Sequence, residues 1–294
     1  MDAAVIIGFS YSKSLKFTDR PFIPGILIDI YHAYKYIRSV IVGDNIIIIT
    51  DIITDLNIEE LRTSITNSVV GTDILNFVTE MRNQGYFRDY VSKEYVFKDI
   101  SDVLKGSKKI FLYYTGHAID GCILLPLVTN EICYRYDSPK DSIITFSSIR
   151  DSISEKSLSN SKILIILDCC NANGLELPYK LIGKVYRLIN KTNKVYPRQK
   201  FICFSATTID ESSVASRHGS IFSHIFFKYL KEKRNIWDLL VTVSDECSKK
   251  YSQTVTVHSS YPDLKMIWRW LCFKDKISIK LNSVENYFII KEKE

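Results

Sequence analysis

The chain has 294 residues, of which 46% are hydrophobic and 24% are charged, as is ordinary for a globular protein with a full core. Its net charge of +6 comes from 39 basic and 33 acidic residues, too small an excess to predict nucleic-acid binding. No segment approaches the roughly 20 apolar residues of a membrane span, and the amino end lacks the basic start of a signal peptide. We therefore expect an intracellular, cytoplasmic protein that binds neither membranes nor nucleic acids. Its seven irregularly spaced cysteines predict free thiols.

Five short apolar runs predict β-strands. The runs at 109–114 and 162–167 are apolar and β-rich, as expected for strands buried on both faces of a parallel sheet. A hairpin arm is expected at 121–126, and alternating apolar residues after residue 270 predict a short carboxy-terminal strand or hairpin. The five predicted strands cover residues 3–9, 46–50, 109–114, 162–167 and 201–205.

Segments of helical periodicity lie between and after these runs. Ile26, Ile30 and Ile37 fall on one face of the first predicted helix, and Thr72 is placed as the N-cap of a later one. Because strands and helices alternate, we predict an α/β fold with a mainly parallel central sheet and helices on both faces. The predicted helices cover residues 25–40, 57–67, 72–82, 146–156, 220–231 and 236–249.

A histidine and a cysteine follow two of the buried strands. His117 ends the sequence YYTGH, and Cys170 ends the sequence DCC. Because open α/β sheets bind ligands at the carboxyl ends of their strands, we expect this imidazole and this thiol to lie at one edge. A neighbouring imidazole can lower the pKa of a thiol from about 8.5 toward neutrality and so supply a nucleophilic thiolate. His117 is the candidate base and Cys170 the candidate nucleophile, with the amides of Gly116 and Cys170 as candidate oxyanion donors. A core histidine and a buried, inert cysteine remain the alternative.

Blocks around these residues occur in a fixed order along the chain: AVIIG at 4–8, PGILID at 24–29, YTGH at 114–117, LDCC at 167–170 and LELPY at 175–179. They resemble the successive blocks of metacaspases, which read approximately A-L-L-I-G, L-x-G-x-x-N-D, Y-S-G-H-G, L-D-S-C-H-S-G and L-D-L-P-Y. Later segments at 205–213, 219–223 and 259–264 resemble further parts of that family. The resemblance covers roughly residues 3–270, and the shared order is more specific than any single block.

The resemblance implies a caspase-like fold and a cysteine endopeptidase. Carried over residue by residue, it makes Cys170 the nucleophile that forms a thioester acyl-enzyme and His117 the general base, while Cys169 occupies a variable position. It also implies a peptidase domain over residues 1–270, followed by a carboxy-terminal extension at 271–294. That domain would comprise a large-subunit-like part (1–179), a basic linker (180–200) expected as a solvated loop, and a small-subunit-like part (201–270).

Three residues indicate which side chain the substrate carries before the scissile bond. Asp29 and Asp168 match the acidic positions with which metacaspases hold Arg or Lys, and Thr115 replaces the serine of that pocket. Paired carboxylates form charge-assisted bonds with a cation and repel an acidic side chain. We therefore expect protein or peptide substrates with Arg or Lys before the scissile bond. Arg20, in the loop before the first helix, keeps open a caspase-type peptidase that cleaves after Asp, and a catalytically silent binding protein is a further alternative.

The resemblance also raises the question of calcium. The activating site of the family needs several oxygen ligands in the loops after the histidine and cysteine blocks. Here those loops offer only Asp120 and Glu176 as weak candidates, so we assign no required cofactor and leave calcium dependence open. By the same resemblance we expect a monomer. Because the linker is rich in Lys and Arg, we also expect autoprocessing within residues 180–200.

Overall fold

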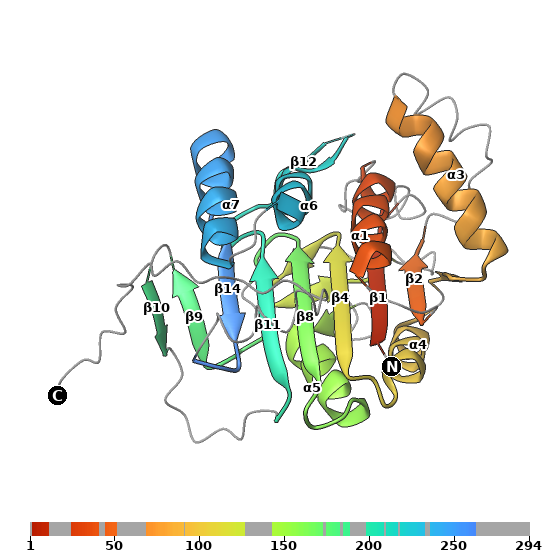
Figure 1. The fold of residues 1–294 in the computed structure, drawn as a ribbon, viewed down its shortest axis with the longest axis horizontal. Helices are drawn as coiled ribbons and strands as arrows, with labels where there is room; N and C mark the ends of the chain where they lie inside the picture. The colour runs from red at the N-terminus through yellow and green to blue at the C-terminus, as the bar shows by residue number, and fades with distance from the viewer. Residues whose placement is uncertain are drawn as a thin grey trace.

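A nine-stranded sheet forms the centre of the molecule (Figure 1). The structure is a computed structural model, and it describes residues 2–11, 25–40, 45–51, 69–90, 92–126, 143–172, 175–182, 185–188, 198–208, 210–216, 218–232 and 236–262. Six neighbouring strands run parallel: β3 (Phe87–Asp89), β2 (Ile46–Thr50), β1 (Asp2–Gly8), β4 (Lys109–Thr115), β8 (Lys162–Asp168) and β11 (Lys200–Ser205). The sheet continues from β11 through β14 (Thr256–Ser259), β9 (Tyr179–Ile182) and β10 (Val185–Leu188), each antiparallel to its neighbour.

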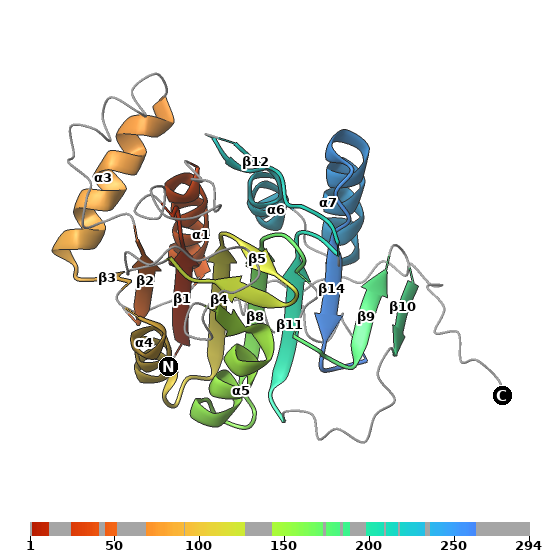
Figure 2. The ribbon, with the colours of Figure 1, turned by 180° about the vertical axis from the view of Figure 1, so that it is seen from behind.

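Helices cover both faces of this sheet, as Figures 1 and 2 show from opposite sides. One face packs against α1 (Ile26–Val40), α3 (Val69–Asn83), α6 (Ile221–Glu232) and α7 (Ile236–Tyr251). The other face packs against α4 (Lys93–Leu104) and α5 (Phe146–Lys156). The predicted α/β class, with a mainly parallel sheet between two helical layers, is therefore confirmed.

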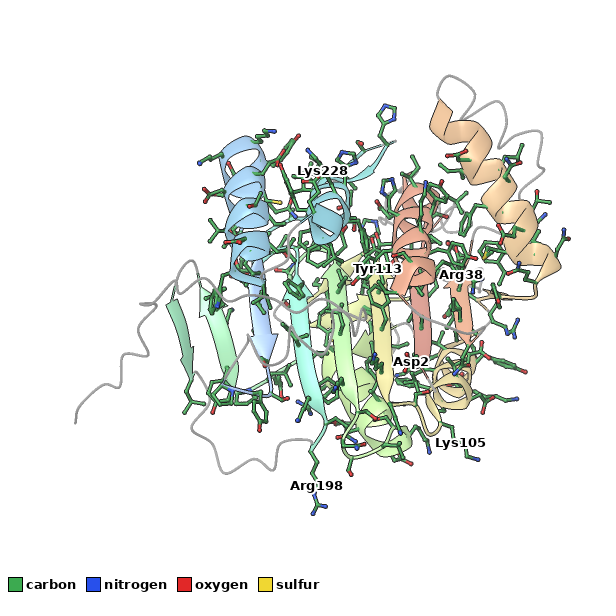
Figure 3. All side chains as sticks on the ribbon, in the orientation of Figure 1. Asp2, Arg38, Lys105, Tyr113, Arg198 and Lys228 are labelled. Carbon is green, nitrogen blue, oxygen red and sulfur yellow. The ribbon has the colours of Figure 1, made fainter. Side chains whose placement is uncertain are left out.

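The side chains of the central strands alternate between the two helical layers. In β4, Tyr113 packs in the core beneath α1 and α6, whereas Tyr114 packs in the core beneath α4 and α5. Figure 3 labels Tyr113 toward the end of β4, between α1 and α6. At the end of β8 the same alternation directs Asp168 toward α6, where Ser223 donates to it, and buries Cys169 in the opposite core.

Two small sheets lie beside the central one. The segment after β4 forms β5 (Ala118–Ile119) and β6 (Cys122–Leu124), which pair with β7 (Ile143–Thr145). This pairing includes the hairpin arm expected at 121–126. The segment before α6 forms a short hairpin of β12 (Ala215–Ser216) and β13 (Gly219–Ser220). The β12–β13 hairpin leads directly into α6.

Several predicted boundaries needed correction. The helix assigned to 72–82 begins at Val69, so Thr72 is not its N-cap; Gly71 lies inside the first turn, where a glycine costs only about 1 kcal/mol. Helix α4 was not predicted, although Val96, Ile100 and Leu104 are spaced for one buried face. The helix predicted at 57–67 and the extension at 271–294 lie outside the described residues.

The first part of the basic segment at 180–200 is not the solvated loop that its charge suggested. Residues 179–182 form β9, which pairs with β14, and residues 185–188 form β10, which pairs with β9. Leu181 is buried in the core beneath α6 and α7, while its neighbour Lys180 is only partly buried. Alternation of this kind lets a charged segment form a strand with one apolar side.

Candidate active site

His117 and Cys170 follow two adjacent strands in the same register. Thr115 of β4 pairs with Asp168 of β8. His117 lies two residues after Thr115, and Cys170 lies two residues after Asp168. Both side chains are partly exposed. Figure 1 shows β4 and β8 ending at the same edge of the sheet. Parallel pairing therefore delivers an imidazole and a thiol to one edge of the sheet, where open α/β sheets bind ligands.

Two tyrosine hydroxyls lie close to the Cα atom of Gly116, the residue just before His117. Its φ angle is +150°, and a Cβ atom there would lie 2.7 Å from the hydroxyl of Tyr114 and 3.1 Å from that of Tyr11. Any side chain would push these tyrosines away from the turn that carries His117. The Gly116 amide donates to the Asp168 carbonyl across 3.4 Å, a long bond that a stronger acceptor could replace. Its oxyanion role stays a prediction.

A loop from the small-subunit-like part holds the segment around Cys170. The amide of Ser213 donates to the Cys170 sulfur at 3.3 Å, and the amide of Asn171 donates to the Glu211 carbonyl at 3.0 Å. Asn171 has a φ of +49°, and its side-chain oxygen accepts the amide of Asp210 at 2.6 Å. These contacts fix the backbone on the carboxyl side of Cys170.

The carboxylate of Glu211 anchors that loop in turn. It accepts the amides of Thr208 and Thr254 at 3.1 Å each, and the Thr254 hydroxyl at 2.6 Å. Partial burial raises the pKa of Glu211, but the hydrogen bonds from Thr254 and Thr208 outweigh it and lower the pKa below its usual value. Glu211 therefore stays ionised and ties the Cys170 contacts to the segment that precedes β14.

The two adjacent cysteines differ in their surroundings. Cys169 is buried, and burial, together with the charge of Asp168, raises the pKa of its thiol well above the usual range. Cys170 is partly exposed. Since the thiolate is the reactive form, Cys169 is the less reactive of the two.

Two buried carboxylates lie beside this edge. Asp29 of α1 is 2% exposed and accepts the Ser220 amide at 2.9 Å; the Thr115 hydroxyl donates to it across 3.4 Å. Asp168 is 3% exposed and accepts hydroxyl hydrogen bonds from Ser213, at 3.0 Å, and from Ser223. The three predicted substrate-binding residues are therefore close together, surrounded by serine donors.

The electrostatics of this pair are unfavourable. Burial, and then the negative charge of Asp168, raise the pKa of Asp29 well above its usual value. Burial also raises the pKa of Asp168. Within the described part of the chain, neither carboxylate forms an ion pair with a lysine, arginine or histidine. A group that brought a positive charge here would relieve both the desolvation and the repulsion.

Comparison with known proteins assigns the family. The family profile described as Caspase domain matches residues 73–266. The chain belongs to the caspase-domain family of cysteine peptidases. Caspase-1 from Spodoptera frugiperda is similar over 88% of this chain and 87% of its own length, with 11% identity and a TM-score of 0.46. A protein from Geobacter sulfurreducens covers 89% of this chain and 94% of its own, with 10% identity and a TM-score of 0.52, which supports the fold. No curated protein sequence matches the chain.

The weak calcium candidates of this caspase domain are not grouped for a metal. Asp120 is exposed in the turn between β5 and β6, and Glu176 lies 3.9 Å from the guanidinium of Arg150. Across the described ranges, no three His, Cys, Asp or Glu side chains lie together as a metal site would require. The described residues therefore do not supply the six or more oxygen ligands that calcium needs. Arg20 lies outside the described residues.

The two carboxylates of the caspase domain could be predicted from sequence, but their hydroxyl partners were not predicted. Ser213 and Ser223 belong to segments that matched the family blocks, which is the signal that could have revealed them. Tyr113, whose hydroxyl lies 2.6 Å from that of Ser223, and Tyr11 carried no such signal as single residues. No helix in the described part of the chain is long and apolar enough to cross a bilayer.

Proposed function

We propose that the chain is a cysteine endopeptidase of the metacaspase type that cleaves peptide bonds after Arg or Lys. The observation that carries this proposal is the buried pair Asp29 and Asp168, beside the loop that bears Cys170. Two carboxylates with raised pKa values favour a guanidinium or ammonium group as their ligand. An aspartate side chain would add a third negative charge to the same buried space, at a cost of several kcal/mol. Thr115 would help to orient the Asp29 carboxylate toward the bound cation.

The proposed reaction uses His117 and Cys170. The imidazole takes the thiol proton, and the sulfur attacks the carbonyl carbon of the scissile bond. Collapse of the tetrahedral intermediate breaks the C–N bond, and the amine leaves with the proton from His117. Water, deprotonated by His117, then hydrolyses the thioester and returns Cys170 to its thiol. The amides of Cys170 and Gly116 would stabilise the oxyanion, the latter by exchanging its long bond to Asp168.

Two alternatives have different signatures. A caspase-type peptidase would cleave after Asp, which requires a cationic residue such as Arg20 in the pocket. A silent binding protein would cleave nothing. The placement of a partly exposed histidine and cysteine after adjacent strands supports the enzyme, because a scaffold has no need of both groups at one edge.

One assay separates these alternatives. Fluorogenic peptides ending in Arg, Lys or Asp are incubated with the wild type, Cys170→Ala and Cys169→Ala, with calcium or a chelator. We expect cleavage of the Arg and Lys peptides by the wild type and Cys169→Ala, and none by Cys170→Ala. Cleavage of the Asp peptide alone would refute the pocket assignment, and no cleavage at all would favour the binding protein. The chelator arm decides calcium dependence.

Further properties follow from the same proposal. We place the peptidase domain at residues 1–270, with processing in the linker beyond β10, and we assign the protein to the cytoplasm as a monomer. Pairing of β9 with β14 supports the monomer, since it covers the edge of β14, and the short strand β10 becomes the edge at this end of the sheet. Prolonged incubation of the wild type should produce two fragments, while Cys170→Ala stays intact. Light scattering measures the oligomeric state directly.

A further inference from the structure

Tyr11, three residues after β1, contacts His117 through both its ring and its hydroxyl. The two ring centroids are 4.7 Å apart, with the planes tilted by 40°. The Tyr11 hydroxyl accepts the backbone amide of His117 at 3.0 Å and donates to the Leu124 carbonyl at 2.6 Å. One buried residue thus bonds the backbone of His117 and packs against its imidazole.

A second tyrosine completes the attachment of the His117 backbone. The hydroxyl of Tyr114 donates to the His117 carbonyl at 2.5 Å, and the two phenol oxygens lie 3.3 Å apart. Both tyrosines are fully buried. Hydrogen bonds in such low-dielectric surroundings are stronger than those exposed to water. Both peptide groups that flank His117 are therefore fixed, although the residue lies beyond the end of β4.

The backbone of Tyr11 is itself held in an uncommon conformation. Its φ angle is +61°, in the left-handed region that non-glycine residues rarely adopt. The buried carboxylate of Asp51, at the end of β2, accepts the amides of Ser10 and Tyr11, both at 2.7 Å. A strained conformation of this kind costs about 1–3 kcal/mol and persists where surrounding contacts impose it, often at functional sites. Asp51 therefore directs the Tyr11 ring back over the turn that carries His117.

From this geometry we propose that Tyr11 is a positioning residue for His117, which restricts the imidazole to the orientation that meets the Cys170 thiol. This proposal rests on the proposed role of His117 as the base. Tyr11 would act through His117, whose backbone and ring it contacts. A base must lie within hydrogen-bond reach of the proton that it takes, and a displacement of about 1 Å can cost up to a hundredfold in rate.

The variant Tyr11→Phe tests the proposal with little change in packing. It keeps the ring and removes the hydrogen bonds to His117 and Leu124. Tyr34→Phe is the matched control, since Tyr34 is also buried, on α1, and its ring packs against Phe77, away from the candidate site. We expect kcat on an Arg peptide to fall about tenfold in Tyr11→Phe with KM within twofold of the wild type, and to stay unchanged in Tyr34→Phe. Equal thermal unfolding midpoints for the two variants exclude general destabilisation.

A second measurement needs no substrate. The rate at which iodoacetamide alkylates Cys170 at pH 7 is followed by mass spectrometry of the peptide, because Cys122 is also accessible. We expect the rate in Tyr11→Phe to fall toward that of His117→Ala, while Tyr34→Phe matches the wild type. An unchanged rate in Tyr11→Phe, or a rate that His117→Ala does not lower, overturns the positioning role. Should the wild type cleave no peptide, the proposed function fails, and the alkylation rates still decide the role of Tyr11.

Discussion

The amide of Ser213 donates to the sulfur of Cys170 across 3.3 Å. The hydroxyl of the same residue donates to Asp168 at 3.0 Å, so Ser213 joins the nucleophile to the carboxylate pocket. In the proposed enzyme, a basic side chain that binds Asp168 would therefore act on a residue that also contacts the sulfur. The loop that carries Ser213 therefore contacts both the proposed substrate pocket and the proposed nucleophile.

The carboxylate pair should show opposite effects on activity and stability. A carboxyl group whose pKa is raised by folding destabilises the fold at every pH above its unfolded value of 3.8, increasingly up to the folded pKa. Asp29→Asn should therefore raise the free energy of unfolding at pH 7, because the amide carries no charge to be desolvated or repelled. It should also lower kcat/KM on Arg peptides by about a hundredfold, because a charge-assisted bond is lost. Denaturant unfolding measures the stability, and peptide kinetics measure kcat/KM. Lower stability with unchanged activity in Asp29→Asn would contradict the assignment of Asp29 to the substrate pocket.

Gly116→Ala should impair activity. The added Cβ atom would lie 2.7 Å from the Tyr114 hydroxyl, so the turn that carries His117 must move. We expect a loss of about tenfold or more in kcat with a smaller change in KM. Gly106→Ala is the control: Gly106 has a φ of +69° but open space around it, so the change brings backbone strain of about 1 kcal/mol without a clash. Equal kcat values for both variants would show that the close approach at Gly116 does not matter.

Loss of the Glu211 carboxylate should loosen the loop that holds Cys170. Glu211→Ala leaves the amides of Thr208 and Thr254 and the Thr254 hydroxyl, all partly buried, without their acceptor. We expect this to cost about 1–3 kcal/mol in unfolding free energy. We expect kcat to fall about tenfold, because the Glu211 carbonyl and the Ser213 amide lose their fixed place. Glu246→Ala on α7, which loses hydrogen bonds from Lys250 and Tyr229, should cost less unfolding free energy than Glu211→Ala and leave kcat unchanged. Similar losses in both variants would refute an anchoring role.

His258 of β14 should make stability depend on pH. Burial, and then the charge of Lys180, lower its pKa from 6.5 to about 3, and neither ring nitrogen has a hydrogen-bond partner among the described residues. The unfolded chain takes up the proton first, so stability is complete above pH 6.5 and is lost as the pH falls toward 3. Relative to His258→Leu, the wild type should lose about 2 kcal/mol between pH 7 and pH 5. His224→Gln, at an exposed position of α6, is the control, and parallel pH curves for the wild type and His258→Leu would contradict the assignment.

The strands and the helices that follow periodic patterns could be predicted from local sequence. The apolar runs that became β4 and β8 each need only a few neighbouring residues to be recognised, and β2 and α5 have the predicted bounds. Local patterns failed where a capping residue or a charge run suggested a boundary. Thr72 lies inside α3, and Lys180 is accommodated in β9 because its neighbour Leu181 faces the core.

The sequence by itself determined that a histidine and a cysteine follow two buried parallel strands, because strand order and side-chain chemistry are written in consecutive residues. Only the tertiary structure decided which groups surround them. Ser220 is 191 residues from the Asp29 carboxylate that it contacts, Tyr11 is 106 residues from His117, and Ser213 is 43 residues from Cys170. Such contacts depend on how helices and loops pack over the sheet, and no local pattern along the chain encodes them.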